Sequence, residues 1–157
     1  MIRDMSKFRA LLALAAIAVA PGVAAQNAIP AQFQGKWVPQ KAACESSVGV
    51  TFSADRVTLF NGKDTEAIGG IEMAGPGFFP PGYAGIQVVA ITEFSGHQPV
   101  TATFNALEKK GVATVEFAPV VRGNQTAQAR AYYARVSKLN LAKRFPLNNV
   151  PLKKCVK

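Results

Sequence analysis

The sequence predicts an all-β protein: a single antiparallel up-and-down β-barrel of about eight strands, with a two-layer β-sandwich as the alternative. Several short stretches alternate apolar and polar residues, which is typical of half-buried strands. Turns rich in Gly, Asn, Asp and Ser separate these stretches at hairpin spacing. No segment after residue 25 shows a helical period. We prefer the barrel because closure leaves no exposed strand edge.

Residues 1–25 have the features of a secretory signal peptide. Three basic side chains precede an apolar run at residues 10–20, and small residues at 23–25 offer a cleavage site. The run is too short to cross about 30 Å of hydrocarbon. We therefore expect a periplasmic or secreted protein, without integral membrane insertion, whose mature chain is one domain over residues 26–157.

Residues 33–44 hold the only tryptophan, Trp37, which we expect in the core, and the first of two cysteines. Two cysteines in an exported chain most simply form one disulfide, so we predict a bond between Cys44 and Cys155. In the chain-entropy model, closing a loop of this length contributes about 4 to 5 kcal/mol. The C-terminal tail then runs along the domain to bring Cys155 back to Cys44.

Two strands are predicted at residues 48–53 and 56–60, joined by a turn. Asn61-Gly62 follows at once and is a strong signal for a two-residue hairpin turn. The next strand, residues 65–73, contains two consecutive glycines in its middle, where we expect a bend or a bulge.

Residues 74–85 cannot form regular structure because they contain three prolines and four glycines. The same segment carries Phe78, Phe79 and Tyr83. An irregular loop with three aromatic rings either folds back on the core or presents them to a ligand. Loops of this length in compact domains are often functional, so we take these rings as candidate ligand-binding residues.

The second half of the barrel begins with residues 86–94, the most regular predicted strand. Residues 100–107 alternate again, residues 108–111 form a tight charged turn, and residues 112–117 return.

Residues 126–138 are predicted as the last long strand, with alanines on one face. A bulge near Tyr132-Tyr133 leaves Arg130, Tyr132 and Arg135 outside, because an unpaired buried guanidinium is costly. The tail after residue 138 contains two prolines and has room for at most one short helical turn, around residues 141–144.

The C-terminal region is strongly basic. The net charge of +9 becomes +7 once residues 1–25 are removed, and nine cations follow the last acidic residue, Glu116. Such a stretch attracts anionic partners, although a solvated basic face is the alternative interpretation. We take Arg130, Tyr132, Arg135, Lys143 and Arg144 as candidate ligand-binding residues.

Gly35-Lys36-Trp37 resembles the Gly-x-Trp signature of lipocalin-like (calycin) barrels. In that family the tryptophan packs across the closed end of the barrel, and an arginine covers it. Arg130 and Arg135 lie on the last long predicted strand, but no motif marks either as that arginine. The resemblance implies a barrel with a mouth for an apolar or amphipathic ligand.

The sequence offers little catalytic chemistry, and we expect no enzyme, cofactor or metal. His97 is the only histidine, in a turn flanked by Gly and Pro. With both cysteines paired, the chain cannot assemble the usual zinc ligands. No Gly-x-Ser-x-Gly elbow and no phosphate-binding glycine loop are present.

The favoured hypothesis is an exported non-enzymatic binding protein of the cell envelope. It engages an anionic or amphipathic ligand through the aromatic loop and the basic C-terminal region. The alternative is an inhibitor or immunity-type protein that binds an acidic envelope enzyme, and a small hydrolytic enzyme is the second alternative. We do not expect nucleic acid as a partner, because exported proteins rarely meet it.

Overall fold

A computed structural model shows one antiparallel sheet of nine strands in the order β4-β3-β2-β1-β9-β8-β7-β6-β5. It describes residues 28–76, 79, 82–90, 100–117 and 126–156. The predicted signal peptide, Phe78 and His97 lie outside these described residues. The strands are β1 (Gly35–Pro39), β2 (Gly49–Phe52), β3 (Arg56–Phe60), β4 (Thr65–Gly69), β5 (Ile71–Gly75), β6 (Ile86–Ala90), β7 (Val100–Phe104), β8 (Val112–Phe117) and β9 (Leu152–Lys154).

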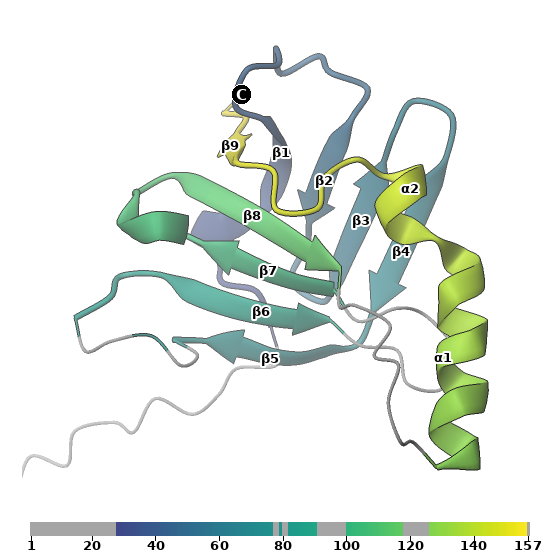
Figure 1. Ribbon diagram of the computed structural model, residues 1–157. Helices are drawn as coiled ribbons and strands as arrows, with labels where there is room; N and C mark the ends of the chain where they lie inside the picture. The colour runs from purple at the N-terminus through teal and green to yellow at the C-terminus, as the bar shows by residue number, and fades with distance from the viewer. Residues whose placement is uncertain (1–27, 77–78, 80–81, 91–99, 118–125, 157) are drawn as a thin grey trace, which may run out of the picture.

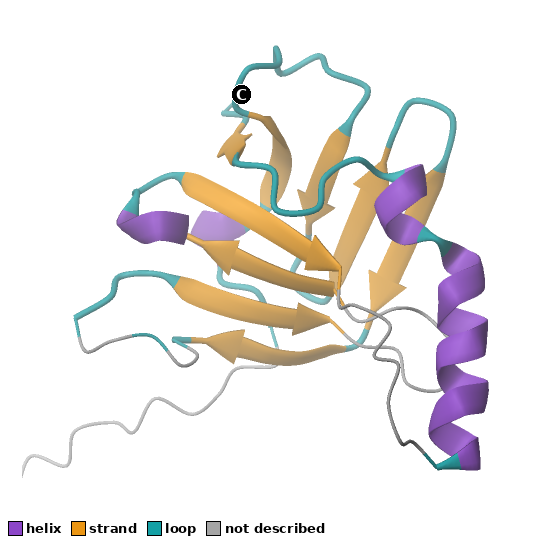
Figure 2. Ribbon diagram, in the orientation of Figure 1, coloured by secondary structure: helices purple, strands orange, loops and turns teal. Residues whose placement is uncertain are grey.

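The sheet curls into a nearly closed barrel, with β1–β4 steeply inclined to β5–β8 (Figures 1 and 2). Its two edge strands, β4 and β5, are consecutive in the chain and are joined through Gly70, whose φ of 74° is left-handed. This is the bend predicted at the glycine pair. The up-and-down barrel is therefore confirmed. Residues 65–75 form two strands where one was predicted, the tail adds β9, and the predicted strand at residues 126–138 is absent, so the sheet has nine strands where about eight were predicted.

Four aromatic rings fill the interior of the barrel. Phe104 lies at the centre, 4.7 Å from Phe33, 4.7 Å from Phe52 and 5.3 Å from Trp37 between ring centroids. Trp37 is 2 % exposed, and its indole N–H donates to the carbonyl of Phe33 at 2.9 Å. Burying the tryptophan thus leaves its one polar group satisfied, as a core tryptophan requires. The prediction that Trp37 lies in the core is confirmed.

The connection after β3 differs from the predicted two-residue turn. It has four residues, and within it Gly62 is left-handed, with φ 84°. The side-chain oxygen of Asn61 accepts hydrogen bonds from the backbone N–H groups of Lys63 at 2.9 Å and Asp64 at 2.7 Å. The side chain of Asn61 therefore forms an Asx turn. The Asn-Gly pair in the sequence did not distinguish this turn from a two-residue hairpin turn.

The predicted strand at residues 126–138 is wrong: this segment is the helix α1 (Ala127–Leu139). Its alternation of alanine with polar residues fitted a strand, but alanine, glutamine, arginine and lysine are strong helix formers. Left-handed Asn140, with φ 47°, ends the helix. The predicted short turn is present as α2 (Leu141–Arg144).

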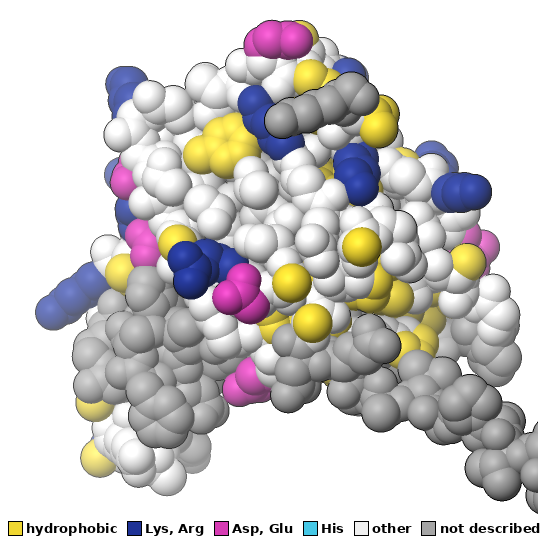
Figure 3. Space-filling view, turned by 180° about the vertical axis from the view of Figure 1, so that it is seen from behind, with side chains coloured by type: hydrophobic (Ala, Val, Ile, Leu, Met, Phe, Trp, Pro, Cys, Tyr) yellow, Lys and Arg dark blue, Asp and Glu magenta, His cyan; other side chains and the backbone are white. Residues whose placement is uncertain are grey.

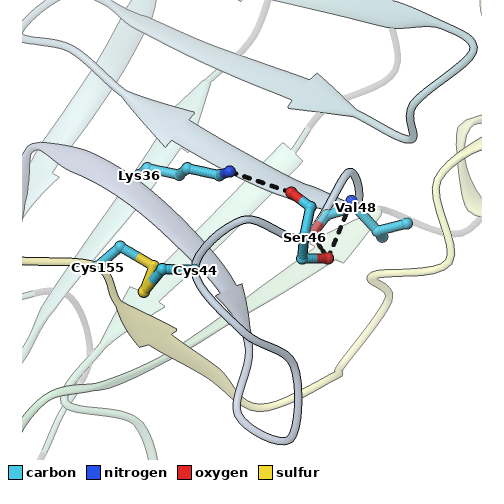
Figure 4. The surroundings of a disulfide bond; sticks show 5 residues. All are labelled: Lys36, Cys44, Ser46, Val48 and Cys155. Atoms are coloured by element: carbon cyan, nitrogen blue, oxygen red, sulfur yellow. Dashed lines mark hydrogen bonds between the residues drawn. A yellow bond between two sulfur atoms is a disulfide. The ribbon is translucent and has the colours of Figure 1, made fainter.

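The disulfide between Cys44 and Cys155 is present, with an S–S distance of 2.13 Å and Cα atoms 5.6 Å apart. It joins the end of β9 to the loop between β1 and β2 (Figure 4). Beside it, Lys36 Nζ donates to the carbonyl of Ser46 at 3.0 Å, and the backbone N–H of Cys155 donates to the carbonyl of Lys36 at 2.8 Å. The tail therefore returns to the first strand as predicted, and it enters the barrel wall between β1 and β8.

The barrel has two ends of different construction, which we call the pocket end and the helix end. The loop between β5 and β6 and the turn between β7 and β8 lie at the pocket end, and α1 and α2 lie at the opposite end (Figure 1). Among the described residues, no helix is long and apolar enough to span a membrane.

Candidate ligand-binding pocket

A pocket of about 710 Å³ opens at the pocket end of the barrel. Four parts of the chain line it: the 3-10 turn η1 (Ala31–Phe33) with Trp37, residues 82–84, the turn of residues 105–111, and Lys154 on β9. Phe33 and Trp37 form its aromatic floor. The indole N–H donates a hydrogen bond to the carbonyl of Phe33, and both rings pack against Phe104. These contacts hold the floor in place.

Lys154 points toward the inside of the barrel. Lys154 on β9 is the register partner of Trp37 on the neighbouring strand β1, and paired residues point to the same side of a sheet. Leu152, two positions earlier on the same face, belongs to the core. Lys153 lies between them and therefore faces outward. The sheet thus places one lysine stem beside the tryptophan, and its Nζ donates to the carbonyl of Gln32 at 2.7 Å at the pocket wall.

The aromatic loop forms another wall of the pocket. Tyr83 lines it, and the ring of Phe79 stacks on Tyr83 with centroids 4.2 Å apart. Both side chains are half-buried. Gly85 permits this arrangement, because a Cβ there would lie 2.0 Å from the Tyr83 ring and 2.4 Å from the carbonyl oxygen of Phe104. The loop therefore folds back onto the barrel.

Asn105 joins the aromatic loop to the turn of residues 105–111. Its carbonyl accepts the Tyr83 hydroxyl, and its side-chain amide donates to the carbonyl of Ala84 at 2.8 Å. Its side-chain oxygen accepts the backbone N–H of Gly111 at 3.0 Å. The residue is left-handed, with φ 55°, which asparagine tolerates better than most residues. One side chain therefore holds two pocket walls together.

The turn itself is longer than the tight charged turn predicted at residues 108–111. It begins at Asn105 and contains the 3-10 turn η2 (Ala106–Glu108). Glu108 and Lys110 lie on its pocket side. With Lys154, the pocket therefore has two cations and one acid around an aromatic floor.

The structure separates the residues that we predicted would share one site. Tyr83 lines the pocket, Phe79 supports it, and Phe78 lies outside the described residues. The five remaining candidates are on the helices at the other end of the barrel (Figure 1). Arg130, Tyr132 and Arg135 are on α1, and Lys143 and Arg144 are on α2.

Arg144 is occupied within the protein. Its guanidinium forms ion pairs with Asp64 and with Glu66, the latter at 3.0 Å, and its carbonyl accepts the side-chain amide of Asn61 at 2.6 Å. The hydrogen bond to Asp64 is the main cause that raises the pKa of Arg144 above its ordinary value, with Glu66 adding to it. Arg144 therefore anchors α2 to the loop between β3 and β4.

Charges on the face seen from behind are dispersed. Figure 3 shows Lys and Arg side chains spread over this face, with Asp and Glu side chains among them, and the described residues form no single basic patch there. On the helices, Arg130, Lys138 and Lys143 are exposed.

Sequence reasoning missed Trp37, Asn105, Lys110 and Lys154 as pocket residues. The alternation of Leu152 and Lys154 before Cys155 is a weak signal, because the direction of Lys154 depends on the pairing of β9 with β1. The left-handed conformation of Asn105 carries no comparable signal.

Among the described residues, no group of three or more His, Cys, Asp or Glu side chains is placed to hold a metal ion. Comparisons of the chain with protein-family models, with curated proteins and with solved structures found no match.

Proposed function

We propose that this chain is an exported, non-enzymatic binding protein of the cell envelope whose pocket takes an amphipathic ligand with an anionic group. The observation that carries the proposal is the inward-facing Lys154 beside Trp37, in a pocket of about 710 Å³. A volume of this size suits a small organic ligand, and such sites are typically apolar with a few placed polar groups. The signal-like residues 1–25 and the disulfide support export.

Each part of the pocket has a separate role in this proposal. The floor of Phe33 and Trp37 receives the apolar part of the ligand, because burying apolar surface there removes it from water. The ammonium groups of Lys154 and Lys110 receive the anionic part. Charge-assisted hydrogen bonds of this kind are stronger than neutral ones. Asn105 and Gln32 offer further donors and acceptors at the wall.

Titration with decanoate tests the proposal, with 1-decanol as the neutral analogue of equal chain length. Trp37 is the only indole and lines the pocket, so its fluorescence reports occupancy. We expect saturable binding of decanoate that weakens with added salt. Lys154→Met keeps the aliphatic stem and removes the charge, and should weaken decanoate binding about tenfold, which corresponds to about 1.4 kcal/mol.

Lys153→Met is the matched control, because it makes the same chemical change on the outward face of the same strand. Its affinity for decanoate should stay within about twofold of the wild type. Equal weakening by the two substitutions would contradict a specific role for Lys154. Failure of the unmodified protein to bind decanoate would contradict the proposed ligand class.

A further inference from the structure

The turn of residues 105–111, which contributes to the pocket lining, also holds a large apolar side chain in water. Leu107 is 74 % exposed, although its neighbours Asn105 and Glu108 both line the pocket. Among the described residues, only Leu107 and Val156 are exposed large apolar side chains. A single exposed leucine is ordinary by itself, so its backbone and its surroundings decide whether it has a role.

The backbone at this position is unfavourable for leucine. Asn105, Leu107 and Glu108 are all left-handed, with φ values of 55°, 56° and 58°. Asparagine gains side-chain hydrogen bonds here, and glycine would adopt the conformation freely. Leucine has no such local compensation, and it also loses contact with the core. Residues held in sparsely populated conformations concentrate at functional sites.

We propose that Leu107 is a ligand-contacting residue, and that the pocket takes a single-chain anionic amphiphile whose chain extends over the rim. This inference rests on the proposed function and deepens it. The aromatic floor takes the first part of the chain and Lys154 takes the anionic group. Leu107 stands in the chain between the lining residues Asn105 and Glu108, and in this proposal its exposed side chain extends the apolar surface beyond the pocket lining.

The proposal predicts opposite effects of one substitution on stability and on affinity. Leu107→Gly relieves the left-handed backbone and removes the apolar contact. Its urea midpoint should therefore equal or exceed that of the wild type, and its affinity for long chains should fall. The expected weakening for dodecanoate is about fivefold, the effect of losing one to two buried methylene contacts. Butanoate, which is too short to reach the rim, should show no change.

Two further variants complete the experiment. Leu107→Met retains an apolar side chain of similar size and should retain the affinity for dodecanoate. Lys109→Gly adds a glycine to the same turn without touching Leu107, and should bind all chain lengths as the wild type does. Affinities are measured by Trp37 fluorescence, and the chain-length series of butanoate, octanoate and dodecanoate gives the signature that a merely structural role would not produce.

The outcomes separate this inference from the function beneath it. If Leu107→Gly binds every chain length as the wild type does, while Lys154→Met still weakens binding, the role of Leu107 is overturned and the pocket function stands. If the wild type binds none of the carboxylates, both fail. If dodecanoate binding is unchanged but Leu107→Gly reduces sedimentation with phosphatidylglycerol vesicles, Leu107 contacts a lipid surface and the proposal is again overturned.

Discussion

The two ends of the barrel are finished in different ways. At the helix end, three apolar side chains that follow α1 join the core: Leu141, Phe145 and Leu147. At the pocket end, the aromatic loop and the turn of residues 105–111 meet through the hydrogen bonds of Asn105 and leave a concavity above Trp37. The described residues of the helix end pack through apolar surface, whereas the pocket end is framed by polar contacts.

This difference explains why the candidate residues divide as they do. The described residues of the helix end direct their apolar side chains into the core, and of the two cations on α2, Arg144 pairs within the protein and Lys143 is exposed. An end framed by hydrogen-bonded loops keeps its interior accessible. The comparison therefore predicts that substitutions at the helix end change stability alone, whereas those at the pocket end change ligand affinity.

The largest effect is expected for Phe145→Ala at the helix end. Phe145 is fully buried, and truncation of a core phenylalanine costs about 3 to 5 kcal/mol of unfolding free energy. The affinity of the folded variant for decanoate should remain within about twofold of the wild-type value, because the cavity left by the missing ring lies at the opposite end of the barrel from the pocket. Urea denaturation and fluorescence titration below the unfolding transition measure the two quantities. A parallel loss of affinity would show that the ends are coupled.

An intermediate effect is expected for Asn105→Ala at the pocket end. It removes two side-chain hydrogen bonds and places alanine in a left-handed conformation, so the unfolding free energy should fall by about 1 to 2 kcal/mol. Decanoate binding should weaken as well, because the two walls are no longer joined. Asn105→Gly is the informative partner variant. It relieves the backbone strain, but it still lacks the two side-chain hydrogen bonds of Asn105. Its stability should recover in part while its affinity stays low. Unchanged affinity in both variants would argue against a positioning role.

The smallest effect is expected for Arg144→Met. It removes the ion pairs of Arg144 with Asp64 and Glu66, and because these groups are partly solvated the cost should be about 1 kcal/mol, less at high salt. The raised pKa of Arg144 adds no pH dependence below strongly alkaline pH, because its stabilising effect is complete wherever the unfolded guanidinium is charged. Lys143→Met, which changes an exposed neighbour, should be neutral in the same urea experiment. A larger loss for Lys143→Met would refute the assignment of the anchor to Arg144.

Much of the barrel was predictable because its signals are local. Period-two alternation located β3 at its observed bounds and indicated the strand at residues 100–107, which is observed as β7 (Val100–Phe104). Two cysteines in a chain with a signal-like N-terminal segment were enough to predict their pairing. The helix α1 was missed because alanine fits both a strand and a helix, and its spacing there imitates a strand.

The pocket was harder to predict because it depends on contacts between distant segments. The direction of Lys154 follows from the pairing of a three-residue strand with β1, and no short sequence window contains that pairing. The aromatic loop was recognised as a candidate, but its partner Asn105 lies 22 residues from Tyr83 and bonds to it through the backbone carbonyl. A conformational requirement of this kind leaves no distinctive residue pattern.

The position of β9 also determines when folding can finish. Its residues pair with β1 on one side and β8 on the other, and the adjoining cysteine bonds to a partner 111 residues earlier. During synthesis or translocation, a nascent chain that has delivered only its first eight strands has a gap in the wall between β1 and β8. Contacts this distant in sequence slow folding. The barrel wall is therefore completed only after residue 155 has emerged.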